Sequence, residues 1–139
     1  MAKKHPENKY DLVLYDLDGT LQDSVPLIVE SFHKAYERVF GRCDRTDADL
    51  MTQYADLLAT RAKGDFKGKP QALIDRALKV DPKHPTALMM AGQSAYKSAD
   101  YAKAIGHWET VLSVLPAGSP DAIQVKAEIA DAKNRQANR

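Results

Sequence analysis

Two carboxylates near the start of the chain stand in a pattern that could bind or transfer phosphate. Asp16 and Asp18 lie two residues apart in DLDGTLQDS, directly after the β-prone run YDLVLY. A carboxylate at the carboxyl end of a strand sits where open α/β sheets bind ligands, and Gly19 lets the chain turn so that backbone amides can face a phosphate. Mg²⁺ binds through one or two carboxylates together with phosphate and water. The pattern therefore predicts phosphoryl chemistry, with Mg²⁺ as a candidate cofactor at Asp16 and Asp18.

Residues 10 to about 50 resemble the opening of haloacid dehalogenase-like phosphatases, of the phosphoglycolate phosphatase and pyrophosphatase kind. The resemblance implies that Asp16 attacks phosphorus and that Asp18 protonates the leaving group. The family also needs a Ser or Thr after a second strand, a Lys that balances charge, and a later acidic pair. Gly64-Asp65 opens like that acidic loop, but Lys69 stands where the second carboxylate is needed. A Mg²⁺-dependent phosphohydrolase is therefore the alternative function, and a non-catalytic one leads.

The segments around this motif predict one strand followed only by helices. Residues 10–15 favour a strand, and residues 24–41 favour an amphipathic helix of about five turns, because apolar residues recur there every three or four positions. The polar stretch at 41–47 separates a β-α fragment, residues 1–43, from the remainder, residues 44–139. Gly, Pro, Asp and Ser bound five expected helices in that remainder, at 48–63, 70–80, 86–98, 101–114 and 120–135. The predicted fold class is mainly α, a helical array preceded by a short β-α segment.

The helical remainder contains an internal repeat. Three residues recur at an offset of 34: Leu78, Val80 and Pro82 return as Leu112, Val114 and Pro116. A helix-turn-helix period of 34 residues is typical of tetratricopeptide repeats, and the second unit resembles that repeat closely. Its small residues Gly92 and Ala104 let neighbouring helices approach, while Trp108 fills the space between repeats. We expect two repeats, residues 44–139, closed by a final capping helix.

The amino-acid sequence of this helical region also resembles a narrower family. The stretches DADLMTQYADLLA, GKPQALIDRALKVDPKHPTALMMAG and DYAKAIGHWETVLSVLPAGSPDA are similar to the tetratricopeptide domain of c-type cytochrome biogenesis factors, over about residues 47–134. The resemblance implies a non-catalytic scaffold that presents apocytochrome to the haem ligation machinery, in relatives that are membrane-anchored and periplasmic. Two family openings that do not normally share a chain suggest a chimera, as an engineered or recombined fusion.

In tetratricopeptide arrays the first helix of each repeat lines a concave face that holds peptides. The family pattern places nine residues on that face: Thr86, Met89, Gln93, Tyr96 and Lys97 in the second repeat, and Thr52, Ala55, Ala59 and Lys63 in the first. Met89 and Tyr96 would offer an apolar surface rimmed by polar groups, which suits a peptide or an amphipathic helix of a partner protein. The alternative is that both pack against the final helix or the N-terminal one.

The amino-acid composition limits the kinds of partner and cofactor that we expect for the chain. With 20 Lys and Arg against 19 Asp and Glu the net charge is +1, so the sequence predicts no nucleic-acid partner. Cys43 is the single cysteine and the four histidines lack metal-binding spacing, so the scaffold requires no cofactor. No apolar run is long enough for a membrane segment, which predicts a cytoplasmic chain as it stands. A lone strand leaves backbone groups unpaired, and a second copy could associate at its edge.

Overall fold

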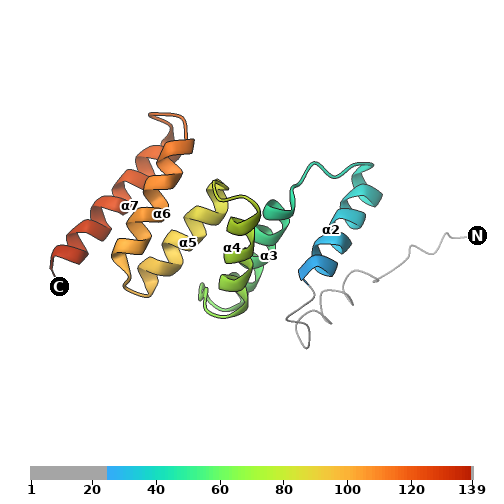
Figure 1. Cartoon of the computed structure of the whole chain (residues 1–139), viewed down its shortest axis with the longest axis horizontal. Coiled ribbons are helices and arrows are strands. Elements are labelled where there is room, and N and C mark those ends of the chain that lie inside the picture. The colour runs from blue at the N-terminus through green and yellow to red at the C-terminus, as the bar shows by residue number, and fades with distance from the viewer. Residues whose placement is uncertain (1–24, 139) are drawn as a thin grey trace, which may run out of the picture. The chain divides into compact units, whose positions relative to one another are not determined.

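A computed structural model describes residues 25–138 of the 139-residue chain. Six α-helices follow one another in this part: α2 (Val25–Phe40), α3 (Asp47–Arg61), α4 (Lys69–Val80), α5 (Pro85–Lys97), α6 (Tyr101–Val114) and α7 (Pro120–Ala137), as Figure 1 shows. The five helices expected beyond residue 44 are all present, and their ends lie within two residues of the expected ones.

The expected fold class is wrong in its β-α part. Every element between residues 25 and 138 is helical, so this part of the chain is all-α. The strand expected at residues 10–15 lies outside the described residues. The association of two copies at the edge of that strand therefore stays a prediction. A strand is stable only where neighbouring strands pair its backbone N–H and C=O groups, and residues 25–138 contain no strand that could do so.

The chain divides into two compact units, Met1–Cys43 and Asp44–Arg139. In the first unit α2 carries His33, whose Nδ1 lies 3.1 Å from Sγ of Cys43. The rings of Tyr36 and Phe40, one turn apart on α2, stack with their centroids 5.7 Å apart. The second unit contains α3 to α7. The assignment of the first unit to a phosphatase-like fragment stays a prediction.

The second unit is built from helical hairpins. α3 packs against α4 and α5 packs against α6, while α4 contacts α5 and so joins the two hairpins. α7 packs along α6, and the three helices α5, α6 and α7 lie next to one another in Figure 1. This arrangement is a tetratricopeptide-like helical array, in which each helix buries its apolar stripe against its neighbours.

Trp108 is the largest buried side chain of the second hairpin, with 2% of its surface exposed. Eight further buried residues from α5, α6 and α7 form the same core: Leu88, Ala95, Ala104, Ile105, Val111, Val125, Ile129 and Ala132. The indole lies directly on the backbone of Gly92, where a Cβ atom would be 2.2 Å from Nε1 of Trp108. The expected reason for Gly92, a close approach of α5 and α6, is therefore confirmed.

The first helices of the two hairpins, α3 and α5, correspond at a residue offset that differs from the 34 residues of the sequence repeat. α3 and α5 end with the same geometry: Lys63 (φ 56°) and Ala99 (φ 59°) adopt positive φ, and the next amide donates to Ala59 O and Ala95 O respectively. These ends are 36 residues apart, whereas the C-caps of α4 and α6, Asp81 and Leu115, are 34 apart. The first repeat is therefore two residues longer from the end of its first helix to the end of its second: the connection 62–68 is four residues longer than 98–100, and α4 is two residues shorter than α6.

Candidate functional site

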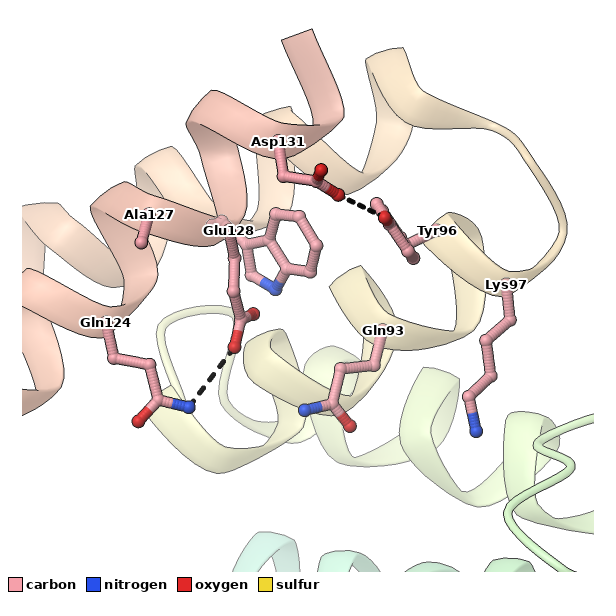
Figure 2. Close-up of a pocket in the computed structure, with 8 residues that line it drawn as sticks. Gln93, Tyr96, Lys97, Gln124, Ala127, Glu128 and Asp131 are labelled. Atoms are coloured by element: carbon pink, nitrogen blue, oxygen red, sulfur yellow. Dashed lines mark hydrogen bonds between the residues drawn. The ribbon is translucent and has the colours of Figure 1, made fainter. Parts of the chain in front are cut away.

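A cavity of about 400 Å³ opens between α5 and α7. Its lining comes from three helices: Gln93, Tyr96 and Lys97 from α5, Trp108 from α6, and Gln124, Ala127, Glu128 and Asp131 from α7. Figure 2 shows Gln93 on one wall and Gln124 and Glu128 on the other. A volume of this size is in the range that holds small ligands or large side chains of a partner.

A second hollow of about 260 Å³ adjoins the first one nearer the N-termini of α5 and α7. Pro85, Thr86 and Met89 of α5 and Asp121, Gln124 and Val125 of α7 line it, together with Val111 of α6 and the C-cap of α6, Leu115. Gln124 borders both hollows. We call the two together the α5–α7 groove. It extends along most of α5, which gives it the length to hold several residues of a peptide or helix.

Two buried polar atoms in this groove lack a hydrogen-bond partner within residues 25–138: Nε1 of Trp108 and Oε2 of Glu128. The other carboxylate oxygen of Glu128, Oε1, accepts a hydrogen bond of 3.3 Å from Gln124 Nε2 (Figure 2). Leaving a buried polar group unpaired costs about 1–3 kcal/mol, and native proteins leave few such groups. The residues that carry this donor and this acceptor, Trp108 and Glu128, line the same cavity.

The end of the groove is closed by a charged cluster on Tyr96. The Tyr96 hydroxyl donates a hydrogen bond to the carboxylate of Asp131, which Arg135 also binds through Nε at 3.0 Å. The hydrogen bond to Asp131 raises the pKa of Tyr96, and the same bond, aided by Arg135, lowers the pKa of Asp131. The Arg135 guanidinium lies over the Tyr96 ring, 5.4 Å from its centroid. These contacts hold the tyrosine in place as a wall of the cavity.

The structure brings together the five site residues expected in the second repeat. Gln93, Tyr96 and Lys97 line the larger hollow, and Thr86 and Met89 line the smaller one. The Lys97 side chain is directed elsewhere, because its Nζ donates to Gly64 O and lies 5.2 Å from the Phe66 ring centroid. The Lys97 ammonium group thus contacts the α3–α4 connection and not the centre of the groove.

The site residues expected in the first repeat lie differently. Thr52, Ala55 and Ala59 are buried, with at most 2% of their surface exposed, and the Thr52 hydroxyl donates to Asp49 O. Lys63 is exposed and directly follows Ala62, the C-cap of α3. The mapping assumed an offset of 34, but α3 and α5 match at 36. With that shift Gln53, Leu57 and Thr60 of α3 correspond to Met89, Gln93 and Tyr96, and all three are exposed.

Sequence reasoning missed the residues that α7 contributes, because α7 was expected to be only a capping helix. A signal for its role exists in the sequence: Pro85-Thr86-Ala87 at the start of α5 returns as Pro120-Asp121-Ala122 at the start of α7, 35 residues later. Both prolines occupy the first turn, and both alanines are buried. α7 is thus placed as the first helix of a third repeat and supplies the second wall of the groove.

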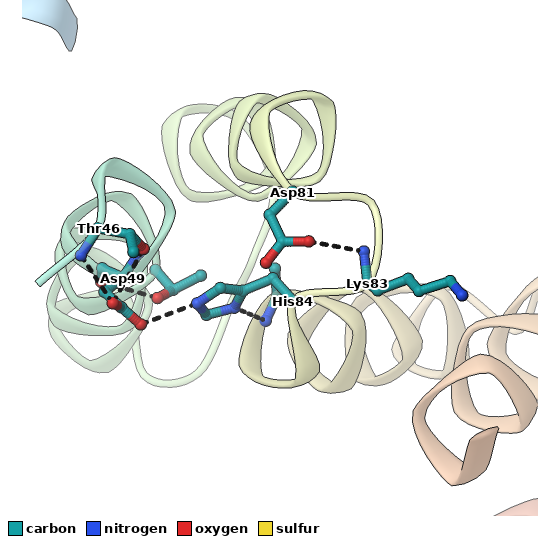
Figure 3. A network of polar contacts seen from close by, with 7 residues as sticks. Thr46, Asp49, Asp81, Lys83 and His84 are labelled. Carbon is teal, nitrogen blue, oxygen red and sulfur yellow. Dashed lines mark hydrogen bonds and ion pairs between the residues drawn. The ribbon is translucent and has the colours of Figure 1, made fainter. Parts of the chain in front are cut away.

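Where α5 meets the first hairpin, a buried histidine joins the helices (Figure 3). His84, 6% exposed, caps α5 by accepting the Ala87 amide on Nδ1, so its Nε2 carries the proton and donates to Asp49 Oδ1 at 2.9 Å. Burial raises the pKa of Asp49, but hydrogen bonds from the Thr46 backbone and from His84 outweigh it and leave this pKa below its ordinary value. The network fixes α3 against the start of α5.

The carboxylate motif cannot be placed in this site. Asp16 and Asp18 lie outside the described residues, so their catalytic and Mg²⁺-binding roles stay predictions. Within residues 25–138 no group of three His, Cys, Asp or Glu side chains could hold a metal ion. Over the same residues no helix is long and apolar enough to cross a membrane.

Comparisons with known proteins agree with the helical array. No protein-family model matches the chain. It is 33% identical over 102 residues to the cytochrome c-type biogenesis protein CycH of Pseudomonas aeruginosa, covering 73% of this chain and 25% of CycH. It is 34% identical over 68 residues to NrfG, a subunit of the formate-dependent nitrite reductase complex of Escherichia coli O157:H7, covering 49% of this chain and 34% of NrfG.

A solved structure shares the fold. The crystal structure of the YfrE protein from Vibrio parahaemolyticus superposes with a TM-score of 0.52 at 22% identity, over 63% of this chain and 94% of that one. The chain is thus a tetratricopeptide-like array similar in sequence to a c-type cytochrome biogenesis protein, and it spans a quarter to a third of its curated relatives. Neither relative is a phosphatase by name, so the phosphatase likeness and the fusion hypothesis gain no support from them.

Proposed function

We propose that this chain is a protein-interaction module that binds a segment of a partner polypeptide in the α5–α7 groove. The observation that carries the proposal is that two residues lining this groove each hold a buried polar atom, Trp108 Nε1 and Glu128 Oε2, with no hydrogen-bond partner within residues 25–138. A peptide supplies both a carbonyl acceptor and hydrogen donors, so it can satisfy both atoms at once. The groove residues on α5, with Met89 and Tyr96 as apolar contacts, suit an amphipathic segment.

The similarity to CycH supports a place for this module in the assembly of c-type cytochromes. The partner would then be a cytochrome polypeptide before it holds haem. Such a chain has not yet buried its apolar residues, and a groove with apolar walls and a few polar groups would bind it in preference to the folded, haem-loaded protein.

The test compares the haem-free and the haem-loaded form of one c-type cytochrome, each titrated calorimetrically into the purified full chain. We expect binding of the haem-free form only. Ala127→Gln should weaken it about tenfold or more, because Ala127 lines the cavity and a longer side chain would fill it. Ala130→Gln is the matched control: Ala130 is also exposed on α7 but is not part of the lining, and its replacement should leave the affinity unchanged. Equal affinity of the two variants would place the binding surface elsewhere.

A further inference from the structure

The charges around the α5–α7 groove are mostly negative. Asp121, Glu128 and Asp131 line it from α7, and of these Asp131 is paired with Arg135 at the edge of the groove. Lys97 is the only basic residue among the described residues of the lining. Because Lys97 donates its Nζ to Gly64 O and stacks on Phe66, it does not balance these carboxylates. The chain as a whole carries a net charge of only +1, so this acidic lining is a local feature. It complements a positively charged occupant.

The chain contains its own example of such recognition at the edge of the groove. Arg135 places its guanidinium over the Tyr96 ring and donates from Nε to Asp131 at 3.0 Å. A cation is thus held jointly by an aromatic face and a carboxylate. Both parts of this arrangement are favourable, since aromatic faces attract cations and a charged donor strengthens a hydrogen bond.

One turn earlier on α7, Glu128 and Trp108 offer the same two kinds of group, and within residues 25–138 no cation is paired with them. Glu128 precedes Asp131 by three residues, and the Trp108 ring lies beside the Tyr96 ring, with 5.8 Å between centroids. Trp108 is 2% exposed, and neither its Nε1 nor Glu128 Oε2 has a hydrogen-bond partner within residues 25–138. A carboxylate oxygen needs a donor and the indole N–H needs an acceptor.

We infer that the α5–α7 groove selects a partner segment bearing a lysine or arginine, whose cationic head binds Glu128 while a backbone carbonyl of the segment accepts from Trp108 Nε1. The inference rests on the proposed function, since it names the chemistry of the segment that the groove would bind. It assigns Glu128 as the residue that sets charge preference and leaves the apolar contacts to Met89 and Tyr96.

The test uses three designed amphipathic peptides of about five helical turns that share one leucine face. Their polar positions are all Lys, all Gln or all Glu, and none contains an aromatic residue. Binding to the full chain is followed by the fluorescence of Trp108, the single tryptophan of the sequence. We expect the Lys peptide to bind about tenfold or more tightly than the Gln peptide, and the Glu peptide to bind most weakly.

Two acid-to-amide variants separate the groove from the general field of the protein. Glu128→Gln should reduce the preference for the Lys peptide over the Gln peptide about tenfold, with little effect on the Gln peptide itself. Glu109→Gln is the control, because it removes the same charge from an exposed residue of α6 that is not part of the groove lining. This variant should keep the preference for the Lys peptide.

The outcomes distinguish the inference from the function on which it rests. Equal binding of the Lys and Gln peptides, or an unchanged preference in Glu128→Gln, would overturn the selection of a cation while the groove remained a peptide site. Absence of binding by all three peptides would overturn the inference, and the calorimetric titration with haem-free cytochrome would then decide on its own whether the proposed function also fails.

Discussion

The two junctions of the helical array differ in whether their polar groups have hydrogen-bond partners. At the first junction, where α5 meets α3 and α4, the polar groups are paired: His84 with Asp49 at 2.9 Å, Ser94 with Gln71 at 2.5 Å, and Lys97 with Gly64 O. At the second junction, where α5 and α6 meet α7, the Tyr96–Asp131 bond closes one end, but Trp108 Nε1 and Glu128 Oε2 stay without partners in the described part of the chain.

The difference separates a structural contact from the binding site that we propose in the same fold. Paired polar groups fix the relative position of two helices and leave nothing for a ligand. Unpaired ones carry a cost in the isolated protein that a partner can remove. Since both junctions are built from the same kind of helical hairpin, we propose that the side chains and not the backbone distinguish a binding site from a structural contact. The following substitutions test this contrast.

The largest effect is expected from Gly92→Ala. A Cβ at this position would lie 2.2 Å from Trp108 Nε1 and 2.6 Å from Cδ1, so the indole must move out of the core of the second junction. We expect a loss of about 3 kcal/mol in the free energy of unfolding, measured by urea denaturation. Gly106→Ala on α6 is the control, because a Cβ there meets no atom within 4 Å; it should gain about 0.5–1 kcal/mol. Similar effects of both changes would mean that Trp108 does not rest on Gly92.

His84→Ala should cost about 2 kcal/mol, because it removes both the cap of α5 and the partner of Asp49. Ser119→Ala removes only the cap of α7, where the Ser119 hydroxyl accepts the Ala122 amide, and should cost about 1 kcal/mol. Thermal unfolding of the two variants side by side measures the difference. If the serine variant were the less stable one, the first junction would not be the more firmly paired.

Asp49 should make the first junction sensitive to acid. Its pKa is lower in the folded chain than in the unfolded one, so its contribution to stability is complete above its ordinary value of 3.8 and is lost as the pH falls through the lower, folded value. Asp49→Asn should therefore unfold more easily at neutral pH and show a shallower decline in stability below about pH 4. Unfolding curves from pH 7 to pH 2 measure both effects. Parallel curves for the two proteins would contradict the role of Asp49.

The smallest effect is expected from the same acid-to-amide change at the second junction. Glu128→Gln should alter the free energy of unfolding by less than about 0.5 kcal/mol, because it removes a charge whose Oε2 atom has no partner in residues 25–138. Urea denaturation at neutral pH is the measurement. A loss as large as that of Asp49→Asn would show that Glu128 is a structural residue, and the contrast between the junctions would fail.

The sequence predicts the part of the site that depends on local patterns. Helix ends follow from caps such as Ser119 and Asp100, and the closeness of Gly92 and Trp108 follows from the repeat pattern. The α5 residues of the groove were found for the same reason, because one helical repeat fixes which face each residue occupies.

The remainder depends on contacts that no local pattern encodes. The longer connection between α3 and α4 changes which residues of the two hairpins correspond, so Thr52 and Ala59 are buried where groove residues were expected. The Lys63 and Ala99 geometry that reveals this change is visible only in the structure. The groove wall on α7, Glu128 included, was missed because α7 was expected to be only a capping helix. That the α7 side chains and Trp108 line the same cavity is a tertiary feature.

The most direct test of the binding site uses the single indole N–H of the chain. In a proton–nitrogen correlation NMR spectrum the indole N–H of Trp108 gives one side-chain signal. The Lys peptide is titrated into the full chain, and the position of this signal is followed. We expect this signal to move downfield as Nε1 gains an acceptor, with the same saturation curve as backbone amides of α5 and α7. An unmoved indole signal, with shifts confined to α3 and α4 or absent altogether, would contradict the assignment of the α5–α7 groove as the binding site.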